Sequence, residues 1–128
     1  MSGPKWLSRE AVEAINRELA GQGGLPGLKD EYALEAALAR PLHKAAYGES
    51  DVLALAAAYL CGIVRNHPLS DGNKRSGFLS AFTFLYINGL LIDADQASVV
   101  AFVVAVAAGE IDEEGATRFL RDHTVPLS

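Results

Sequence analysis

The residues with the clearest chemical potential in this sequence lie close together, between Arg65 and Arg75. His67 could accept the proton of a hydroxyl group as a general base. Asp71 offers a hard carboxylate oxygen for Mg²⁺, a cation that commonly bridges one or two carboxylates to substrate phosphates. The stretch therefore combines a candidate base with a candidate metal ligand, and it also carries three cations, Arg65, Lys74 and Arg75.

Two of these cations fall in the expected first turn of a helix that runs from about Asn73 to Asn88. The exposed N–H groups at a helix start already carry positive potential, so a sequence selected only for stability places Asp or Glu there. Lys74 and Arg75 each cost about 0.3–1 kcal/mol at this point unless an anion binds and offsets them. Gly72 has no Cβ and would let a phosphate approach the backbone closely. The pattern predicts an anion site.

Ordinary structural roles also fit these residues. From its position, Asp71 fits a cap on the same helix as well as it fits a metal ligand. Gly72 could serve only a turn, and Lys74 and Arg75 could be solvated charges. Asn73 could brace the loop through local hydrogen bonds or donate to a phosphate oxygen. Spacing and charge alone therefore establish a candidate anion site with a candidate base, and no more.

Capping residues and helical spacing predict an all-α fold, a compact bundle of about six helices, over a single domain of residues 1–128. The expected helix starts are Ser8, Asp30, Ser50 or Asp51, Asn73, Asp95 and Asp112. Pro41 should end the second helix near Arg40, which makes residues 41–50 an irregular connector. Nothing in the pattern predicts a paired sheet.

Two neighbouring helices are expected at the centre of this bundle. The third helix is apolar on nearly all sides and ends at His67-Pro68, because proline pushes the preceding residue out of the α region. Its main apolar stripe is Leu53, Ala57, Leu60 and Val64. The fourth helix is also apolar around most of its circumference and should end at Gly89. The reactive stretch joins these two helices, with Leu69 anchoring it in the core.

Bulk properties exclude several classes of protein. Half of the 128 residues are hydrophobic, which argues against disorder. The chain has 16 acidic and 11 basic residues and a net charge of −5, which argues against direct nucleic-acid binding. A single cysteine suits a reducing compartment, and no apolar stretch approaches the roughly 20 residues that span a bilayer. We expect a cytoplasmic protein with no membrane contact.

Residues outside the reactive stretch give weaker signals. His43 and Tyr47 could touch a ligand, although half-buried packing is their more ordinary role. Residues 23–50 could hold a flap that docks an extended target segment, or they could form an ordinary connector. Cys61 is expected to be a small core residue, and His123 suits the last turn of the last helix, where a cation is favoured.

The run His67-Pro68-Leu69-Ser70-Asp71-Gly72-Asn73-Lys74-Arg75 resembles the signature of Fic/Doc proteins, and its Asn-Lys-Arg ending resembles the Doc (death-on-curing) branch. Three further segments are similar to Doc sequences: Gly23 to Asp30, Leu34 to Pro41 and Ala46 to Glu49. The resemblance covers most of the chain. It implies the all-helical Fic fold, with the active loop between two central buried helices.

The resemblance also implies a role for each matching position. His67 would deprotonate the hydroxyl group of the target, and Asp71 would bind Mg²⁺. Gly72, Asn73 and Lys74 would form an anion cradle. Lys74 and Arg75 would contact the phosphates of ATP, which places Arg75 with His67 and Asp71 among the catalytic residues.

The implied activity is that of Doc-like toxins, which transfer the γ-phosphate of ATP to a threonine of elongation factor Tu and so stop translation. The implied partner is a small Phd-like antitoxin whose C-terminal segment covers the site. Fic proteins that attach AMP usually carry glycine at the place of Lys74 and a second arginine at that of Phe78, and a phenylalanine cannot replace an arginine fork. AMP transfer remains the alternative enzymatic activity, and a non-catalytic binding module is the alternative from another class.

Overall fold

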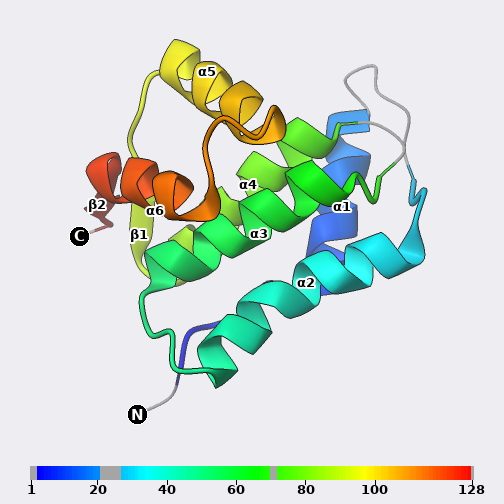
Figure 1. Cartoon of the computed structure of the whole chain (residues 1–128), viewed down its shortest axis with the longest axis horizontal. Coiled ribbons are helices and arrows are strands. Elements are labelled where there is room, and N and C mark those ends of the chain that lie inside the picture. Colours follow the sequence, from blue (N-terminus) through cyan, green and yellow to red (C-terminus); the bar gives the residue numbers. More distant parts are fainter. Residues whose placement is uncertain (1–2, 21–26, 70–71, 128) are drawn as a thin grey trace.

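The fold is a helical bundle with one very small sheet (Figure 1). A computed structural model of the chain describes residues 3–20, 27–69 and 72–127. Its elements in chain order are α1 (Arg9–Ala20), α2 (Glu31–Ala46), α3 (Val52–Asn66), α4 (Asn73–Ile87), β1 (Leu90–Ile92), α5 (Gln96–Ala107), α6 (Glu113–Asp122) and β2 (Thr124–Pro126). The expected all-α class is confirmed, and so are the approximate bounds of five of the expected helices.

Side-chain caps explain where most of these helices begin. A cap oxygen that accepts a hydrogen bond from a backbone N–H satisfies one of the donors left over in the first turn. Five of the six helices in the described part start this way, and the capping residues are Ser8, Asp30, Asp51, Asp95 and Asp112. The remaining helix, α4, starts without one.

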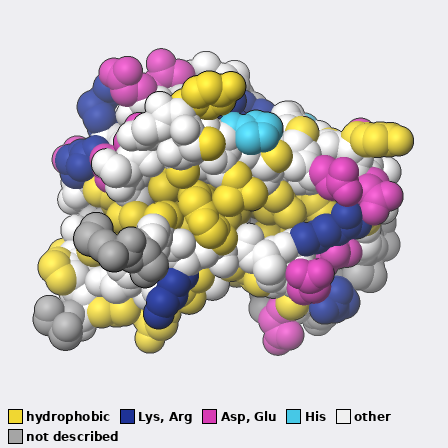
Figure 2. Space-filling model, turned by 90° about the horizontal axis from the view of Figure 1, so that it is seen from below, with side chains coloured by type: hydrophobic (Ala, Val, Ile, Leu, Met, Phe, Trp, Pro, Cys, Tyr) yellow, Lys and Arg dark blue, Asp and Glu magenta, His cyan; other side chains and the backbone are white. Residues whose placement is uncertain are grey.

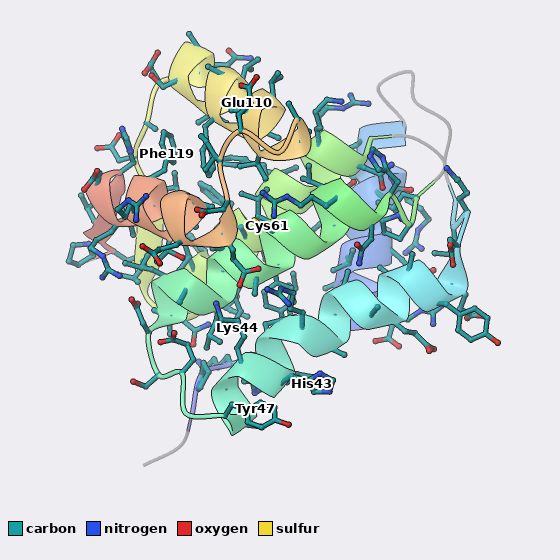
Figure 3. All side chains as sticks on the ribbon, viewed as in Figure 1. His43, Lys44, Tyr47, Cys61, Glu110 and Phe119 are labelled. Atoms are coloured by element: carbon teal, nitrogen blue, oxygen red, sulfur yellow. The ribbon has the colours of Figure 1, made fainter. Side chains whose placement is uncertain are left out.

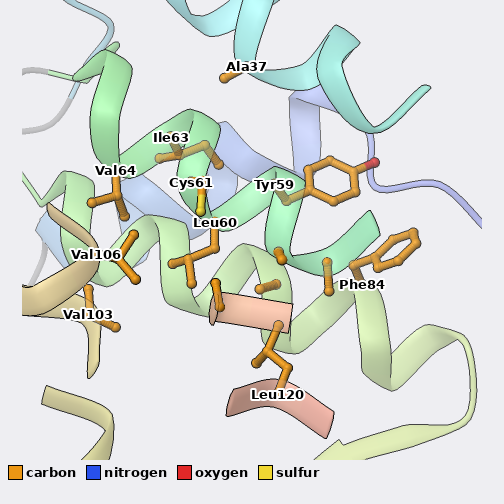
Figure 4. Packing of buried hydrophobic residues seen from close by; sticks show 14 of the residues in the cluster. Ala37, Tyr59, Leu60, Cys61, Ile63, Val64, Phe84, Val103, Val106 and Leu120 are labelled. Atoms are coloured by element: carbon orange, nitrogen blue, oxygen red, sulfur yellow. The ribbon is translucent and has the colours of Figure 1, made fainter. Parts of the chain in front are cut away.

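α3 lies at the centre of the molecule and is covered by other helices (Figures 1 and 4). Every residue from Ala54 to Val64 is buried, as its apolar circumference predicts. Glycines allow close packing on two of its sides. A Cβ on Gly62 would lie 3.1 Å from Ala37 Cα in α2, and a Cβ on Gly77 in α4 would lie 2.6 Å from Val64 Cγ2. The ends of α3 and α4 are therefore held tightly.

The small sheet was not expected from the sequence. β1 and β2 pair antiparallel, with Leu90 opposite Pro126 and Ile92 opposite Thr124. Each strand has three residues, which is too short to produce a recognisable alternation of apolar and polar side chains. Their pairing also depends on α5 and α6 folding back between them, which local sequence does not reveal.

The expected end of α2 near Arg40 is wrong, because the helix continues through Pro41 to Ala46. A proline inside a helix removes one backbone hydrogen bond and costs about 3 kcal/mol in isolation. Here Pro41 is buried, and the turn that follows is held from outside, where Lys44 Nζ lies 2.7 Å from Glu113 Oε2 of α6. Tertiary packing therefore outweighs the local signal, and residues 41–46 of the expected connector are helical.

Glu113 ties α6 to α2 through both of its carboxylate oxygens. Oε1 accepts a hydrogen bond from Arg40 Nε and Oε2 accepts one from Lys44 Nζ, each at 2.7 Å. Burial by itself would raise the pKa of the Glu113 carboxyl, but the hydrogen bonds from Arg40 and Lys44 outweigh it and leave that pKa below its ordinary value of 4.5. The ionised carboxylate therefore stabilises the folded state.

Surface charge and helix hydropathy test the expectations about nucleic acid and membrane. On the face drawn in Figure 2, most of the described Lys and Arg side chains lie beside Asp and Glu, so the described residues on that face form no basic stripe. Among the described residues, none of the helices combines the length and the hydropathy that crossing a bilayer requires.

We expect Glu113→Gln to lower the free energy of unfolding at pH 7 by about 1–2 kcal/mol, after allowing for solvent screening of this partly exposed group. Glu114→Gln is the matched control, because Glu114 is the next residue and its side chain is 83 % exposed in its pair with Arg118. It should cost less than about 0.5 kcal/mol.

The loss caused by Glu113→Gln should also depend on pH. A carboxyl whose pKa is lowered by folding stabilises the protein above its ordinary pKa, and this contribution disappears as the pH falls through the lowered value. Urea unfolding at pH 7 and at about pH 3 should therefore give a smaller difference between wild type and variant at the acid end. Equal losses for the two variants at pH 7 would contradict the assigned role of Glu113.

Candidate active site

The loop between α3 and α4 begins with a histidine in an unusual backbone conformation. His67 is the residue after α3 and has φ 49° and ψ 52°, in the left-handed region. Among the described residues it is the one non-glycine residue with positive φ. Such a conformation is locally unfavourable and persists where the surroundings enforce it, which happens often at functional sites. Pro68, the next residue, prevents the α-helix from continuing at His67, and the His67 side chain is exposed.

The residues after His67 are fixed to a short segment, Gly27 to Asp30, which we call the strap. The carbonyl oxygen of Pro68 accepts hydrogen bonds from the backbone N–H of Lys29 at 2.9 Å and of Asp30 at 3.0 Å. Leu28 and Leu69 form an isolated antiparallel bridge beside them. Leu69 is 1 % exposed, so it anchors the loop in the core as predicted.

Asn73 clamps the same loop from the other side. Its Nδ2 donates to the carbonyl oxygen of Leu69 and its Oδ1 accepts from the N–H of Leu69, both at 3.0 Å. Of the two roles open from the sequence, bracing the loop is the one that the side chain performs here. What Asn73 leaves for an anion is its backbone N–H at the start of α4.

The start of α4 is open to an anion. Gly72 is the N-cap residue, with φ 73° and no side-chain cap, and the first turn contains no acidic residue. The first backbone bond of the helix runs from Ser76 N–H to the carbonyl oxygen of Gly72, at 2.8 Å. Helix geometry leaves the N–H groups of residues 73–75 without an acceptor inside the helix. These groups and the helix dipole favour negative charge at this point.

The two cations of the first turn reinforce this potential. Lys74 and Arg75 are both exposed. Arg75 folds back toward the cap residue, because its Nη2 lies 3.5 Å from the place that a Cβ on Gly72 would take. The structure thus brings Gly72, Lys74 and Arg75 together at one helix start. The helix dipole and these two cations together favour a phosphate group at this helix start.

Asp71, the predicted Mg²⁺ ligand and catalytic residue, lies outside the described residues together with Ser70. So do residues 23–26 of the region in which the sequence placed a flap or a connector. Of the rest of that region, Gly27 to Asp30 form the strap and residues 31–46 belong to α2.

A large cleft lies elsewhere, between α2, α3 and the start of α6, with a volume of about 950 Å³ (Figure 3). Its cations are engaged within the protein. Arg40 and Lys44 bind Glu113, and Arg65 donates to the carbonyl oxygens of Val106 and Ile111. We therefore regard these cations as ties between helices.

Three residues around this cleft had been assigned packing roles from the sequence. Burial of Cys61 is confirmed, and it raises the pKa of the Cys61 thiol to about 11. The expectation for His43 and Tyr47 is wrong, because both are exposed and Tyr47 is 92 % exposed. α2 extends one turn past Pro41 and carries these two side chains out of the core (Figure 3).

Two features beside the loop were missed from the sequence. One is a groove of about 290 Å³ between α4 and α5, lined mainly by apolar side chains, with Lys74 and Arg75 also on its lining. Val100 and Val104 of this groove are 55 % and 51 % exposed. The other is Asn16, a buried polar residue of α1. The sequence could have indicated this burial, because Asn16 lies one helical turn after Val12 and so falls on the apolar face of α1.

We expect Asn73→Ala to weaken the binding of pyrophosphate by about tenfold, because the loop that precedes the open helix start loses its clamp. Asn88→Ala is the matched control. At the other end of α4, Asn88 bonds to the backbone N–H and carbonyl oxygen of Lys5, at 2.8 and 2.9 Å. Both variants should lose about 1–2 kcal/mol of unfolding free energy, and only Asn73→Ala should change the calorimetric affinity. An equal change in both affinities would mean that general stability, and not the loop, controls binding.

Comparison with known proteins agrees with this geometry. A family model described as the Fic/DOC family matches residues 6–85, more than half of the chain and including the whole loop. The protein kinase doc of Escherichia phage P1 is 33 % identical over 113 residues, covering 88 % of this chain and 89 % of that protein. The toxin Doc of Mycolicibacterium smegmatis is 45 % identical over 94 residues, covering 71 % of this chain and 70 % of that protein. The chain belongs to the Fic/Doc family, in its Doc branch.

Proposed function

We propose that this chain is a Doc-like toxin that transfers the γ-phosphate of ATP to a serine or threonine hydroxyl of a target protein. The observation that carries the proposal is the start of α4. There a helix whose N-cap residue is glycine presents Lys74 and Arg75 in its first turn, after a loop that begins at the exposed His67. A polyphosphate fits these groups, because free N–H donors, a helix dipole and two cations all favour it.

Catalysis would rest mainly on positioning and charge stabilisation, as in other phosphoryl transfers. The N–H groups of residues 73–75, with Lys74 and Arg75, would hold the phosphates and stabilise charge on the transferred group. Mg²⁺, when bound, supplies further neutralisation of the phosphate oxygens, and Asp71 would provide its carboxylate ligand. The strap and the Asn73 clamp keep the backbone of the loop in place during this step.

His67 would act as the general base. Its imidazole nitrogen takes the proton of the acceptor hydroxyl, and the hydroxyl oxygen forms a bond to the γ-phosphorus. The bond between that phosphorus and the oxygen bridging to the β-phosphate breaks, and ADP leaves with the electron pair. The exposure of His67 leaves room for a protein substrate to reach it.

Two positions favour γ-phosphate transfer over AMP transfer. Lys74 stands where AMP-transferring Fic proteins have glycine. Phe78 stands where they have a second arginine, and it packs against Phe82, with ring centroids 6.4 Å apart. Position 78 therefore offers no guanidinium fork for the phosphates that AMP transfer must hold.

The relatives support the choice of activity and partners. One is named a protein kinase and the other a toxin. From the resemblance of the loop to Doc toxins, we propose elongation factor Tu as the acceptor, with inhibition of translation as the result, and the cytoplasm as the place of action. A Phd-like antitoxin would restrain the enzyme, and it would dock an amphipathic segment in the apolar groove between α4 and α5. That groove contains Lys74 and Arg75, so its occupant would also cover the phosphate site.

We expect label from γ-labelled ATP, and none from α-labelled ATP, to appear on purified elongation factor Tu when it is incubated with this chain and Mg²⁺. His67→Ala should lower the transfer rate by at least about 100-fold, because the base is lost. His43→Ala, which removes another exposed histidine, should leave the rate unchanged. Label retained only from the α position would establish AMP transfer instead. Absence of both label transfer and calorimetric nucleotide binding would favour a binding module.

We expect Val104→Asp to keep the chain toxic in cells that also produce a Phd-like antitoxin able to neutralise the wild-type chain. A carboxylate in the apolar groove should weaken antitoxin binding by about 10- to 100-fold, since it would be desolvated without a partner. Val125→Asp on β2 is the control, because Val125 is similarly exposed, at 42 %, and lies outside the groove. Growth rescue of the Val104→Asp strain to the same degree as wild type would rule out this docking site.

A further inference from the structure

One buried side chain joins the strap to the first turn of α4. Asn16 of α1 is 3 % exposed. Its Oδ1 accepts a hydrogen bond from the backbone N–H of Gly27 at 3.2 Å, and its Nδ2 donates to Ser76 Oγ at 3.4 Å. Nδ2 also lies 3.7 Å from the place that a Cβ on Gly72 would take. A single amide group thus lies directly beneath the proposed phosphate site.

Packing alone does not explain an asparagine at this position. Its neighbours on the buried face of α1 are Val12 and Leu19, and an apolar residue would continue that face. A buried amide is costly unless it is hydrogen-bonded, so its bonds to Gly27 and Ser76 compensate for its burial. Ser76 is itself fully buried, at 0 % exposure. The pair therefore has the character of a specific polar contact inside an otherwise apolar interface.

The contacts form a closed ring that joins α1, the strap, the loop and the first turn of α4. Asn16 holds Gly27 at one end of the strap, and Lys29 and Asp30 at its other end hold Pro68. The neighbouring Leu69 is clamped by Asn73, and the same turn of α4 returns through Ser76 to Asn16. The ring consists of these hydrogen bonds and of the short stretches of chain that connect the bonded residues. Such a ring fixes the distance between the strap and the helix start.

We propose that Asn16 is a positioning residue for the phosphate site. By holding the strap and the first turn of α4 at a set separation, it keeps the N–H groups of residues 73–75 aimed at the phosphates, and it transmits any displacement of the strap to them. This inference rests on the proposed function for the identity of the ligand, MgATP. The ring of contacts itself is independent of that identity.

The test uses a matched pair of substitutions on one helix. Ser76→Ala removes the hydroxyl that accepts from Asn16. Ser80→Ala removes a hydroxyl one turn later that is equally buried, at 0 %, and whose Oγ has no hydrogen-bond partner within the described part of the chain. Ser76→Ala should raise the calorimetric Kd for MgATP by about fivefold, the effect of one lost hydrogen bond. Ser80→Ala should leave it within about twofold of wild type.

A second variant separates positioning from general stability. Asn16→Asp keeps an oxygen for Gly27 N–H and nearly the same shape, but it adds a negative charge beneath the phosphates. Its Kd for MgATP should exceed that of wild type by about tenfold at pH 8, and the gap should close as the pH falls and the new carboxyl is protonated. A purely structural role would give no such pH profile.

A readout without nucleotide completes the test. In Asn16→Ala, hydrogen exchange at the amides of Lys29 and Asp30 should accelerate by about tenfold, while the amide of Lys5, held by Asn88, keeps its wild-type rate. Unchanged exchange at Lys29 and Asp30, or Kd values for Ser76→Ala and Asn16→Asp within about twofold of wild type, would overturn the role of Asn16. Failure of wild type to bind MgATP would instead refute the proposed function, and the exchange rates alone would then decide the role of Asn16.

Discussion

The burial of α3 from Ala54 to Val64 is the constraint on which the rest of the structure depends. A helix covered on every side cannot slide or rotate without opening cavities, and each buried methylene left without a partner is costly. Gly62 and Gly77 allow α2 and α4 to pack very close to α3. A Cβ added at Gly62 would lie 3.1 Å from Ala37 Cα, and one added at Gly77 would lie 2.6 Å from Val64 Cγ2. The loop from His67 to Gly72 therefore spans two fixed points, and its strained first residue is held there by the core and not by local preference.

The start of α4 differs from the other described helix starts in its capping residue and in its charges. Five helices in the described part have a Ser or Asp cap that satisfies the first turn from within the chain. α4 has glycine at that place and two cations where acidic residues would add stability. An Asp cap would make this turn more stable, but it would occupy one of the backbone donors and bring a negative charge to the place where an anion would bind. The first turn of α4 is therefore less stable than a capped turn, and a bound anion would offset that loss.

Local signals in the sequence predicted a large part of this arrangement. Caps such as Asp51 and Asp112, and the all-round apolarity of Ala54 to Val64, act within a few residues and are readable from the chain alone. The errors came from contacts distant in sequence. α2 passes through Pro41 because α6 holds its last turn, and Tyr47 is exposed for the same reason. The link from Asn16 to Ser76 spans 60 positions, so no local pattern could reveal it.

The small sheet brings together the two ends of the C-terminal part of the fold. β1 follows α4 and β2 follows α6, so their pairing joins the two ends of the segment from Leu90 to Pro126. That segment carries α5 and lies outside the region matched by the family model, which ends at residue 85. The loop and its supporting ring lie entirely within the matched region. One wall of the apolar groove, by contrast, comes from the closed segment. Substitutions on α5 can therefore change the shape of the groove while the loop between α3 and α4 and its supporting hydrogen bonds stay as they are.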